Sequence, residues 1–353
     1  MSKQSEPQSL ATLLASQKAL LAQYLNHLSP NDLDSSTQLP SNPPNPLNVL
    51  RDSAKLLKAH TTKLSLLLIN KPFTVSAITK VLRDISGTCL PAMMSAVDIC
   101  RPDIWGAFLK QHVMASVRAV IREMIVCYDE ATNVANQELE ALAGSAQATE
   151  KVHQAQGRNS LVSTGLVWDA CDVLINLDSI GIAGLAVRRA GEWRDTIKDA
   201  TEELKEWEEG DEEEDDDDDT DSMDDMFSAA NALPRNRPDL KERLATANDK
   251  LKKICMLYAA ISKRRLKTFT PAIASIQKNI HTFDTLLTAL KDLPDSVDDL
   301  ASAFYDLNTD HVDRALQTCV DLATGAAQTV ELSWTGEQDE FTTWVKKWSN
   351  LME

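Results

Sequence analysis

The histidines are the first residues to consider for catalysis, and the six in this sequence are scattered along it. His311, followed by Asp313, comes nearest to a catalytic pair. No nucleophile is placed with these two residues, so adjacent surface positions explain them better. The sequence also lacks a GxxxxGK phosphate loop, a GxGxxG after a strand, an HExxH zinc motif and a GxSxG nucleophile motif. We therefore predict that the chain is not an enzyme and holds no cofactor.

The six cysteines show no metal-binding or disulfide pattern. No two form a CxxC pair, and no histidine lies at ligand spacing beside any of them. Four fall within apolar helical patterns: Cys100, Cys127, Cys255 and Cys319. The pattern predicts buried, reduced thiols in a cytosolic or nuclear protein and no metal site.

The acidic run of residues 202–225 is the strongest local signal. It contains 17 acidic residues against one lysine, and so carries −16 of the chain's formal charge of −17. Such dense like charge predicts a disordered segment, which is either a solvated linker or a tether for basic partners. The rest of the chain is close to neutral and offers no broad positive field, so we expect no direct binding to nucleic acid.

Ser222 lies in this run and is followed by Met223, Asp224 and Asp225. An acid three residues after a serine suits acid-directed kinases such as casein kinase 2. The simpler interpretation is an unmodified linker serine, and the functional hypothesis is phosphorylation, which would add to the negative charge already present.

A basic cluster of Lys263, Arg264, Arg265 and Lys267 follows an apolar helical pattern. Cations at the end of a helix are favourable because they face the negative end of its dipole. This interpretation is preferred over a nuclear localisation signal. A further hypothesis is that the acidic segment folds back onto the cluster.

Apolar residues recur at alternating steps of three and four, which is the mark of helices with one buried face. Two of the clearest runs are Val113, Val117, Val120, Met124 and Cys127, and Leu240, Leu244, Ala247, Leu251 and Ile254. There is no sustained two-residue alternation and no hairpin signal. The sequence therefore predicts an all-α protein of elongated helical bundles.

The expected helices are defined by these runs and by proline, with Pro102, Pro238 and Pro294 each predicted to open one. They cover residues 10–28, 47–70, 74–85, 91–100, 102–142, 160–177, 180–208, 238–266, 271–291, 294–308, 312–332 and 340–351. Phe341, Trp344 and Trp348 are expected to pin the last helix onto the bundle. We expect no secretory signal at the polar N-terminus, and no apolar run approaches the ~20 residues of a membrane span.

Four parts are predicted along the chain. They are an N-terminal helix with a proline-rich loop (1–46), an N-terminal bundle (47–201), an acidic disordered linker (202–237) and a C-terminal bundle (238–353). Alternatively, the acidic segment is a loop inserted within one continuous helical body.

The stretch of residues 162–172, VSTGLVWDACD, is similar to the signature region of the cyclin-D-binding protein family, also called GCIP. Within it we single out Gly165, Trp168, Asp169, Cys171 and Asp172, all with structural roles. Gly165 would permit close approach of a neighbouring helix. Trp168 and Cys171 would lie on the buried side, and the two aspartates at or near the opposite edge.

The resemblance covers most of the chain from about residue 47 and implies a regulator that acts by protein–protein contact. Members are described as negative regulators of cell-cycle progression that bind D-type cyclins and helix-loop-helix transcription factors, in nucleus and cytoplasm. Their leucine-zipper character is only fragmentary here (Leu240, Leu244, Leu251 and Tyr258), and a bundle core explains it equally well. The alternative function is a cytoskeletal or adhesion scaffold of the vinculin and catenin kind, which has the same helical sequence texture.

Overall fold

The computed structural model describes residues 5–29, 43–142, 150–210, 233–234, 236–274 and 276–352. Within these ranges the chain is helical and contains no β-strand, so the all-α prediction is confirmed. Most of the acidic run, including Ser222, lies outside the described residues. The phosphorylation of Ser222 and the folding back of the acidic segment therefore stay hypotheses.

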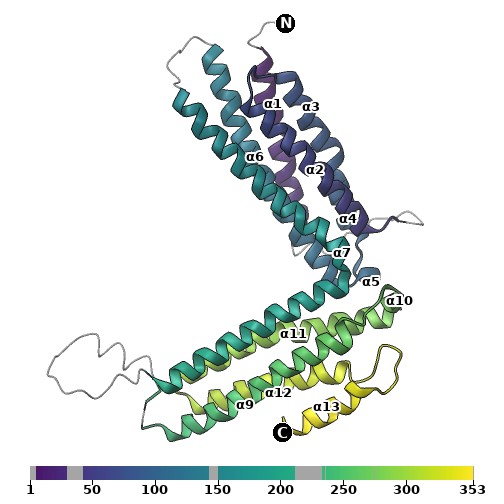
Figure 1. Cartoon of the computed structure of the whole chain (residues 1–353), viewed down its shortest axis with the longest axis vertical. Helices are drawn as coiled ribbons and strands as arrows, with labels where there is room; N and C mark the ends of the chain where they lie inside the picture. The colour runs from purple at the N-terminus through teal and green to yellow at the C-terminus, as the bar shows by residue number, and fades with distance from the viewer. Residues whose placement is uncertain are drawn as a thin grey trace, which may run out of the picture. The chain divides into compact units, whose positions relative to one another are not determined.

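The helices form two compact units, Met1–Gly181 and Ile182–Glu353 (Figure 1). The first unit contains α1 (Ser5–His27), α2 (Pro46–Ile69), α3 (Val75–Asp84), a π-helical segment (Ile85–Cys89), α4 (Leu90–Ile99), α5 (Pro102–Trp105), α6 (Ala107–Leu142) and the first part of α7 (Glu150–Glu209). The second contains the rest of α7, α9 (Pro238–Ile261), a second π-helical segment (Ser262–Leu266), α10 (Pro271–Ala274), α11 (Gln277–Tyr305), α12 (Thr309–Thr329) and α13 (Glu340–Asn350).

The boundary between the units differs from the predicted layout. The helical path of α7 is broken at Gly181, where φ is 61° and ψ is −174°, close to the predicted break between residues 177 and 180. The part after Gly181 was expected in the N-terminal bundle, but it belongs to the second unit. Contacts with the second unit hold this part of the helix there. The ring of Trp207 packs edge-on against that of Tyr305 on α11, with centroids 5.4 Å apart.

The first helix, α1, is also part of the first unit and not a separate element as predicted. It packs along α6 and against α3. Lys18 of α1 forms an ion pair with Asp129 of α6 at 2.6 Å. The buried side chain of Gln17 donates to the carbonyl oxygen of Leu82 at 3.1 Å.

Two of the three predicted proline starts need correction. Pro238 opens α9 as expected. Pro102 opens only the single turn of α5, because Gly106 takes a φ of 85° and the long helix α6 starts after it. Pro294 lies inside α11 and opens nothing.

A hydroxyl from a neighbouring helix helps α11 to continue through Pro294. Proline has no N–H, so the carbonyl of Leu290 lacks the usual donor four residues ahead. The buried hydroxyl of Tyr258, on α9, donates to this carbonyl instead. Burial raises the pKa of Tyr258, so the hydroxyl keeps the proton that it donates.

The basic cluster contains a buried structural residue. Arg265 is 2% exposed and donates to the carbonyls of Val330 and Glu331, just after α12, at 2.8 and 3.0 Å. Its guanidinium also binds both carboxylate oxygens of Asp339, the N-cap of α13, at 2.8 and 2.9 Å. These bonds hold the pKa of Asp339 well below its usual range. Arg265 therefore joins three elements of the second unit.

The predicted packing of α13 is confirmed. Phe341 and Trp348 are buried, and the indole N–H of Trp348 donates to the carbonyl of Lys253 on α9 at 2.9 Å. The fragmentary zipper of α9 is part of the bundle core, since its leucines and Tyr258 are all buried.

Candidate interaction surface

The residue types that commonly carry catalysis are not gathered into a metal cluster in the described part of the chain. No group of three or more His, Cys, Asp or Glu among the described residues could hold a metal ion. The six cysteines are free thiols. Five of them are buried, as predicted, whereas Cys255 is half-buried. Burial raises the pKa of Cys100, Cys127 and Cys171 to about 12, so these thiols stay protonated and are poor nucleophiles. Asp313, which follows His311, binds Arg243 instead, at 2.8 and 3.0 Å.

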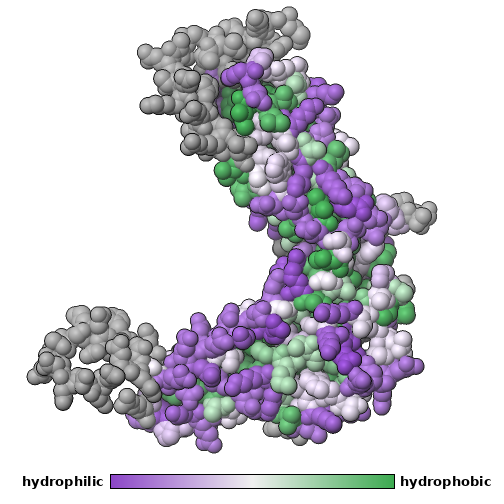
Figure 2. All heavy atoms as spheres, viewed as in Figure 1, coloured by the Kyte–Doolittle hydropathy of each residue, from purple (hydrophilic) through white to green (hydrophobic). Residues whose placement is uncertain are grey.

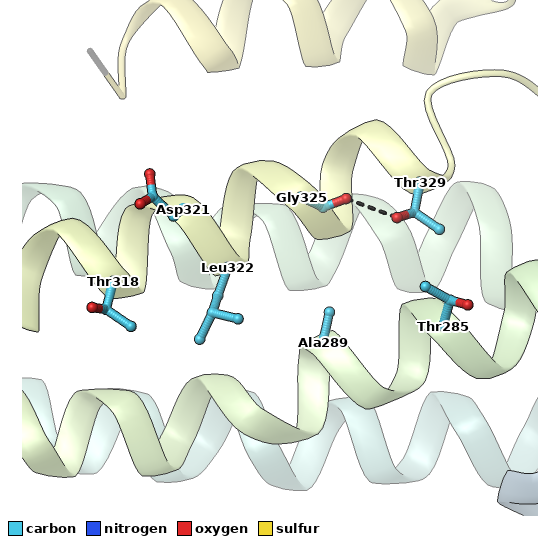
Figure 3. Close-up of a pocket in the computed structure, with 7 residues that line it drawn as sticks. All are labelled: Thr285, Ala289, Thr318, Asp321, Leu322, Gly325 and Thr329. Atoms are coloured by element: carbon cyan, nitrogen blue, oxygen red, sulfur yellow. Dashed lines mark hydrogen bonds between the residues drawn. The ribbon is translucent and has the colours of Figure 1, made fainter.

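An open groove of about 440 Å³ lies between α11 and α12 (Figure 3). Its lining residues are Thr285, Ala289, Thr318, Asp321, Leu322, Gly325 and Thr329. The hydroxyl of Thr329 donates to the carbonyl of Gly325 in its own helix at 2.8 Å. Asp321 accepts from Gln317 at 2.8 Å and is the single carboxylate in the lining. Without a base or a second carboxylate, the groove does not suggest acid–base catalysis.

The signature region forms part of the first half of α7, and the structure separates its residues. The buried side of this helix is centred on Val167, Cys171 and Leu174. Cys171 is buried as predicted, but Trp168 lies at the edge of that side and is 36% exposed, so its predicted burial is wrong. Asp169 is exposed, as expected.

Gly165 does not serve close packing against the part of the chain that the structure describes. A Cβ atom added there would meet none of its heavy atoms within 4 Å. The prediction that Gly165 admits a neighbouring helix is therefore wrong for the bundle itself. The space beside this residue is open.

Two ion pairs join α2 to α7. Lys58 binds Asp172 at 2.6 Å, and Arg51 binds Asp178 at 2.8 Å. Because the residue number rises along one helix as it falls along the other, the two helices run antiparallel. The Lys58 ammonium also lies 5.8 Å from the centroid of the Trp168 ring. Asp172 and Trp168 thus share one lysine where α2 and α7 meet, and this contact helps to position the two helices against each other.

The outer side of α7 carries a row of exposed apolar residues that was not predicted from the sequence. Four apolar side chains remain exposed there: Val162 by 62%, Leu166 by 44%, Val173 by 41% and Ile180 by 38%. With the exposed Asp169 and Asn176 between them, they recur at alternating steps of four and three. We call these six residues the outer stripe. The available signal was that this helix is apolar on two sides, more than one buried face requires.

The composition of this helix has a second consequence. By length and hydropathy alone, Val162–Glu209 is apolar enough to cross a membrane, with an 18-residue window of mean hydropathy 1.6. Only 28% of that window is buried. The core helix of a folded protein passes the same test, so this is weak evidence for a membrane span. Figure 2 shows hydrophobic residues exposed among hydrophilic ones on the visible face of the first unit.

The open space beside Gly165 gives a testable prediction. Gly165→Ala should raise the free energy of unfolding by about 0.5–1 kcal/mol, because alanine favours the helix and its methyl group meets no neighbour. Urea denaturation followed by circular dichroism measures the change. The matched control is Gly181→Ala in the same helix, which should be destabilising because the φ of 61° disfavours a side chain. A loss of stability in Gly165→Ala would show that the space is filled.

Comparison with known proteins bears on this surface. Residues 49–210 match the family model described as Grap2 and cyclin-D-interacting, N-terminal (GCIP). The GCIP resemblance is confirmed over these residues. An uncharacterized protein of Schizosaccharomyces pombe is 27% identical over 86% of this chain and 83% of its own length. The Cyclin-D1-binding protein 1 homolog of Xenopus laevis is 28% identical over 54% of this chain and 53% of its own length.

The GCIP region contains the whole outer stripe and both ion pairs between α2 and α7. It also crosses Gly181 and includes the part of α7 that packs in the second unit. Its family description points to a protein-interaction role. The outer stripe is the exposed apolar feature of α7 within this region, and we take it as the candidate interaction surface.

Proposed function

We propose that this chain is a non-enzymatic regulatory protein that binds a D-type cyclin or a helix-loop-helix regulator in the cytoplasm and nucleus. Through this binding it restrains cell-cycle progression and transcription. The GCIP description and the printed name of the Xenopus relative support a cyclin-type partner. The observation that carries the proposal is the outer stripe, an exposed apolar helix face within the matched residues.

The outer stripe suits protein binding better than packing within the chain. Its four apolar side chains stay 38–62% exposed within the described part of the protein. Their burial by a partner would contribute roughly 25 cal/mol for each Å² of apolar area removed from water. Anchor residues of this kind at the centre of an interface commonly carry most of the binding energy.

The test is isothermal titration calorimetry of the full chain with a D-type cyclin. The double variant Leu166→Asp, Val173→Asp should weaken binding by about tenfold or more, because it places two charges in the centre of the outer stripe, which the partner would cover. Val126→Asp is the matched control, since Val126 lies on α6 of the same unit and is 44% exposed. It should bind like the wild type, and circular dichroism should show an unchanged helix content in all variants.

Two results would contradict the proposal in different ways. If the double variant binds as tightly as the wild type, the outer stripe is not the binding surface. If the wild type itself binds neither a D-type cyclin nor a helix-loop-helix protein, the proposed partners are wrong. Co-sedimentation with actin filaments would then favour the scaffold alternative.

A further inference from the structure

The outer stripe has the spacing of a coiled-coil seam. Its steps of four and three assign Leu166, Val173 and Ile180 to the first core position of successive heptads. The second core position is held by Val162, Asp169 and Asn176. The seam is therefore apolar at one core position and mostly polar at the other.

Asp169 constrains what can cover this seam. Within the described residues it forms no ion pair, whereas Asp172 binds Lys58 and Asp178 binds Arg51. A partner that covers Asp169 takes its carboxylate out of water, which is costly unless a cation or a hydrogen-bond donor faces it. The neighbouring carboxylates are already neutralised, so Asp169 is the position that selects a basic residue.

A second copy of the chain does not meet this requirement. In a parallel pair the two Asp169 carboxylates would face each other, which is repulsive. In an antiparallel pair each would face an apolar residue of the seam, which leaves the charge buried and unpaired. A lipid surface is also disfavoured, because an acid and an amide, Asp169 and Asn176, lie in the middle of the apolar face.

The edge of the seam leaves room for a helix. Gly165 lies one position before Leu166, and a Cβ added there would meet no atom of the described residues within 4 Å. A glycine beside a seam lets another helix approach closely. The combination of heptad spacing, an unpaired carboxylate and an open edge fits a helix rather than a loop or strand.

We propose that the outer stripe binds an amphipathic helix of a partner protein that carries a lysine or arginine facing Asp169. The partner's apolar residues pack on the four apolar side chains of the stripe. This inference rests on the proposed function and specifies the chemistry of the partner at the same surface. The basic residue supplies specificity, because an acidic helix of otherwise equal sequence would place two carboxylates together.

The test uses two synthetic amphipathic peptides of about 21 residues, or three heptads, with leucine at the core positions. They differ only at one central core position, which is lysine in one and glutamate in the other. Fluorescence anisotropy with the full chain should show the lysine peptide binding about tenfold more tightly. In Asp169→Lys the preference should reverse. Leu166→Asp should weaken both peptides, and Val126→Asp should change neither.

A peptide preference that stays the same in Asp169→Lys would overturn the inference. So would co-sedimentation of the wild type with phosphatidylcholine vesicles, or dimerisation that Leu166→Asp abolishes. The cyclin titration is independent of these results. If cyclin binding depends on Leu166 but Asp169→Lys leaves the peptide preference unchanged, the proposed function stands and the inference fails. If the peptide preference reverses but no cyclin binds, the inference stands and the cyclin proposal fails.

Discussion

Replacement of Arg265 by alanine is expected to lower the free energy of unfolding by about 3 kcal/mol. The guanidinium is almost fully buried and is bound by Asp339 and by two carbonyls after α12. It also lies 4.4 Å from the centroid of the Phe341 ring. Alanine would leave the carbonyls without their donor and open a cavity where the side chain stood. The expected loss of stability is at the low end for a broken buried ion pair, because Asp339 is 38% exposed and stays partly hydrated.

Arg264→Ala is the control for this prediction, since it removes the same charge from the adjacent position. Arg264 binds Glu340 at 2.6 Å, but the two side chains are 48% and 80% exposed. Such a surface pair contributes less than about 1 kcal/mol, so the variant should differ little from the wild type. Urea denaturation followed by circular dichroism and tryptophan fluorescence compares the two. Equal stabilities of the two variants would show that the buried network does not stabilise the second unit.

The helices themselves could be predicted because the apolar spacing repeats in nearly every segment. Leu240, Leu244 and Leu251, which belong to one predicted run, are fully buried in the structure. The role of Arg265 could not be predicted in this way. The four basic residues within positions 263–267 look alike in the sequence, and which of them is buried depends on α12 and α13, which follow much later in the chain.

The candidate surface was predicted less well than the fold, for a related reason. A spacing of three and four identifies a stripe but not the side of the helix that the bundle covers. In the first half of α7 two such stripes exist, and the one through Val167, Cys171 and Leu174 is buried. Trp168 and Gly165 lie between the two stripes. A small error in the assumed centre of the buried side therefore turns an expected buried position into an exposed one. The exposed stripe is therefore the one that periodicity alone could not assign.

Tyr258→Phe should lower the free energy of unfolding by about 1–3 kcal/mol, although it removes a single oxygen atom. Pro294 cannot donate to the buried carbonyl of Leu290, and the Tyr258 hydroxyl is the donor that replaces it. In phenylalanine the carbonyl would be buried without a partner. The control is Tyr305→Phe on α11, because Tyr305 is 47% exposed and Tyr258 is 1% exposed. That variant should change stability by less than about 0.5 kcal/mol.

A double-mutant cycle with Pro294→Ala tests the mechanism as well as the magnitude. Alanine at position 294 restores a backbone N–H that can donate to the Leu290 carbonyl in the ordinary helical pattern. Tyr258→Phe should then cost at least about 1 kcal/mol less in the Pro294→Ala background than in the wild type. Equal costs in the two backgrounds would mean that the hydroxyl does not substitute for the missing amide. In that case α11 would pass through Pro294 because of side-chain packing alone.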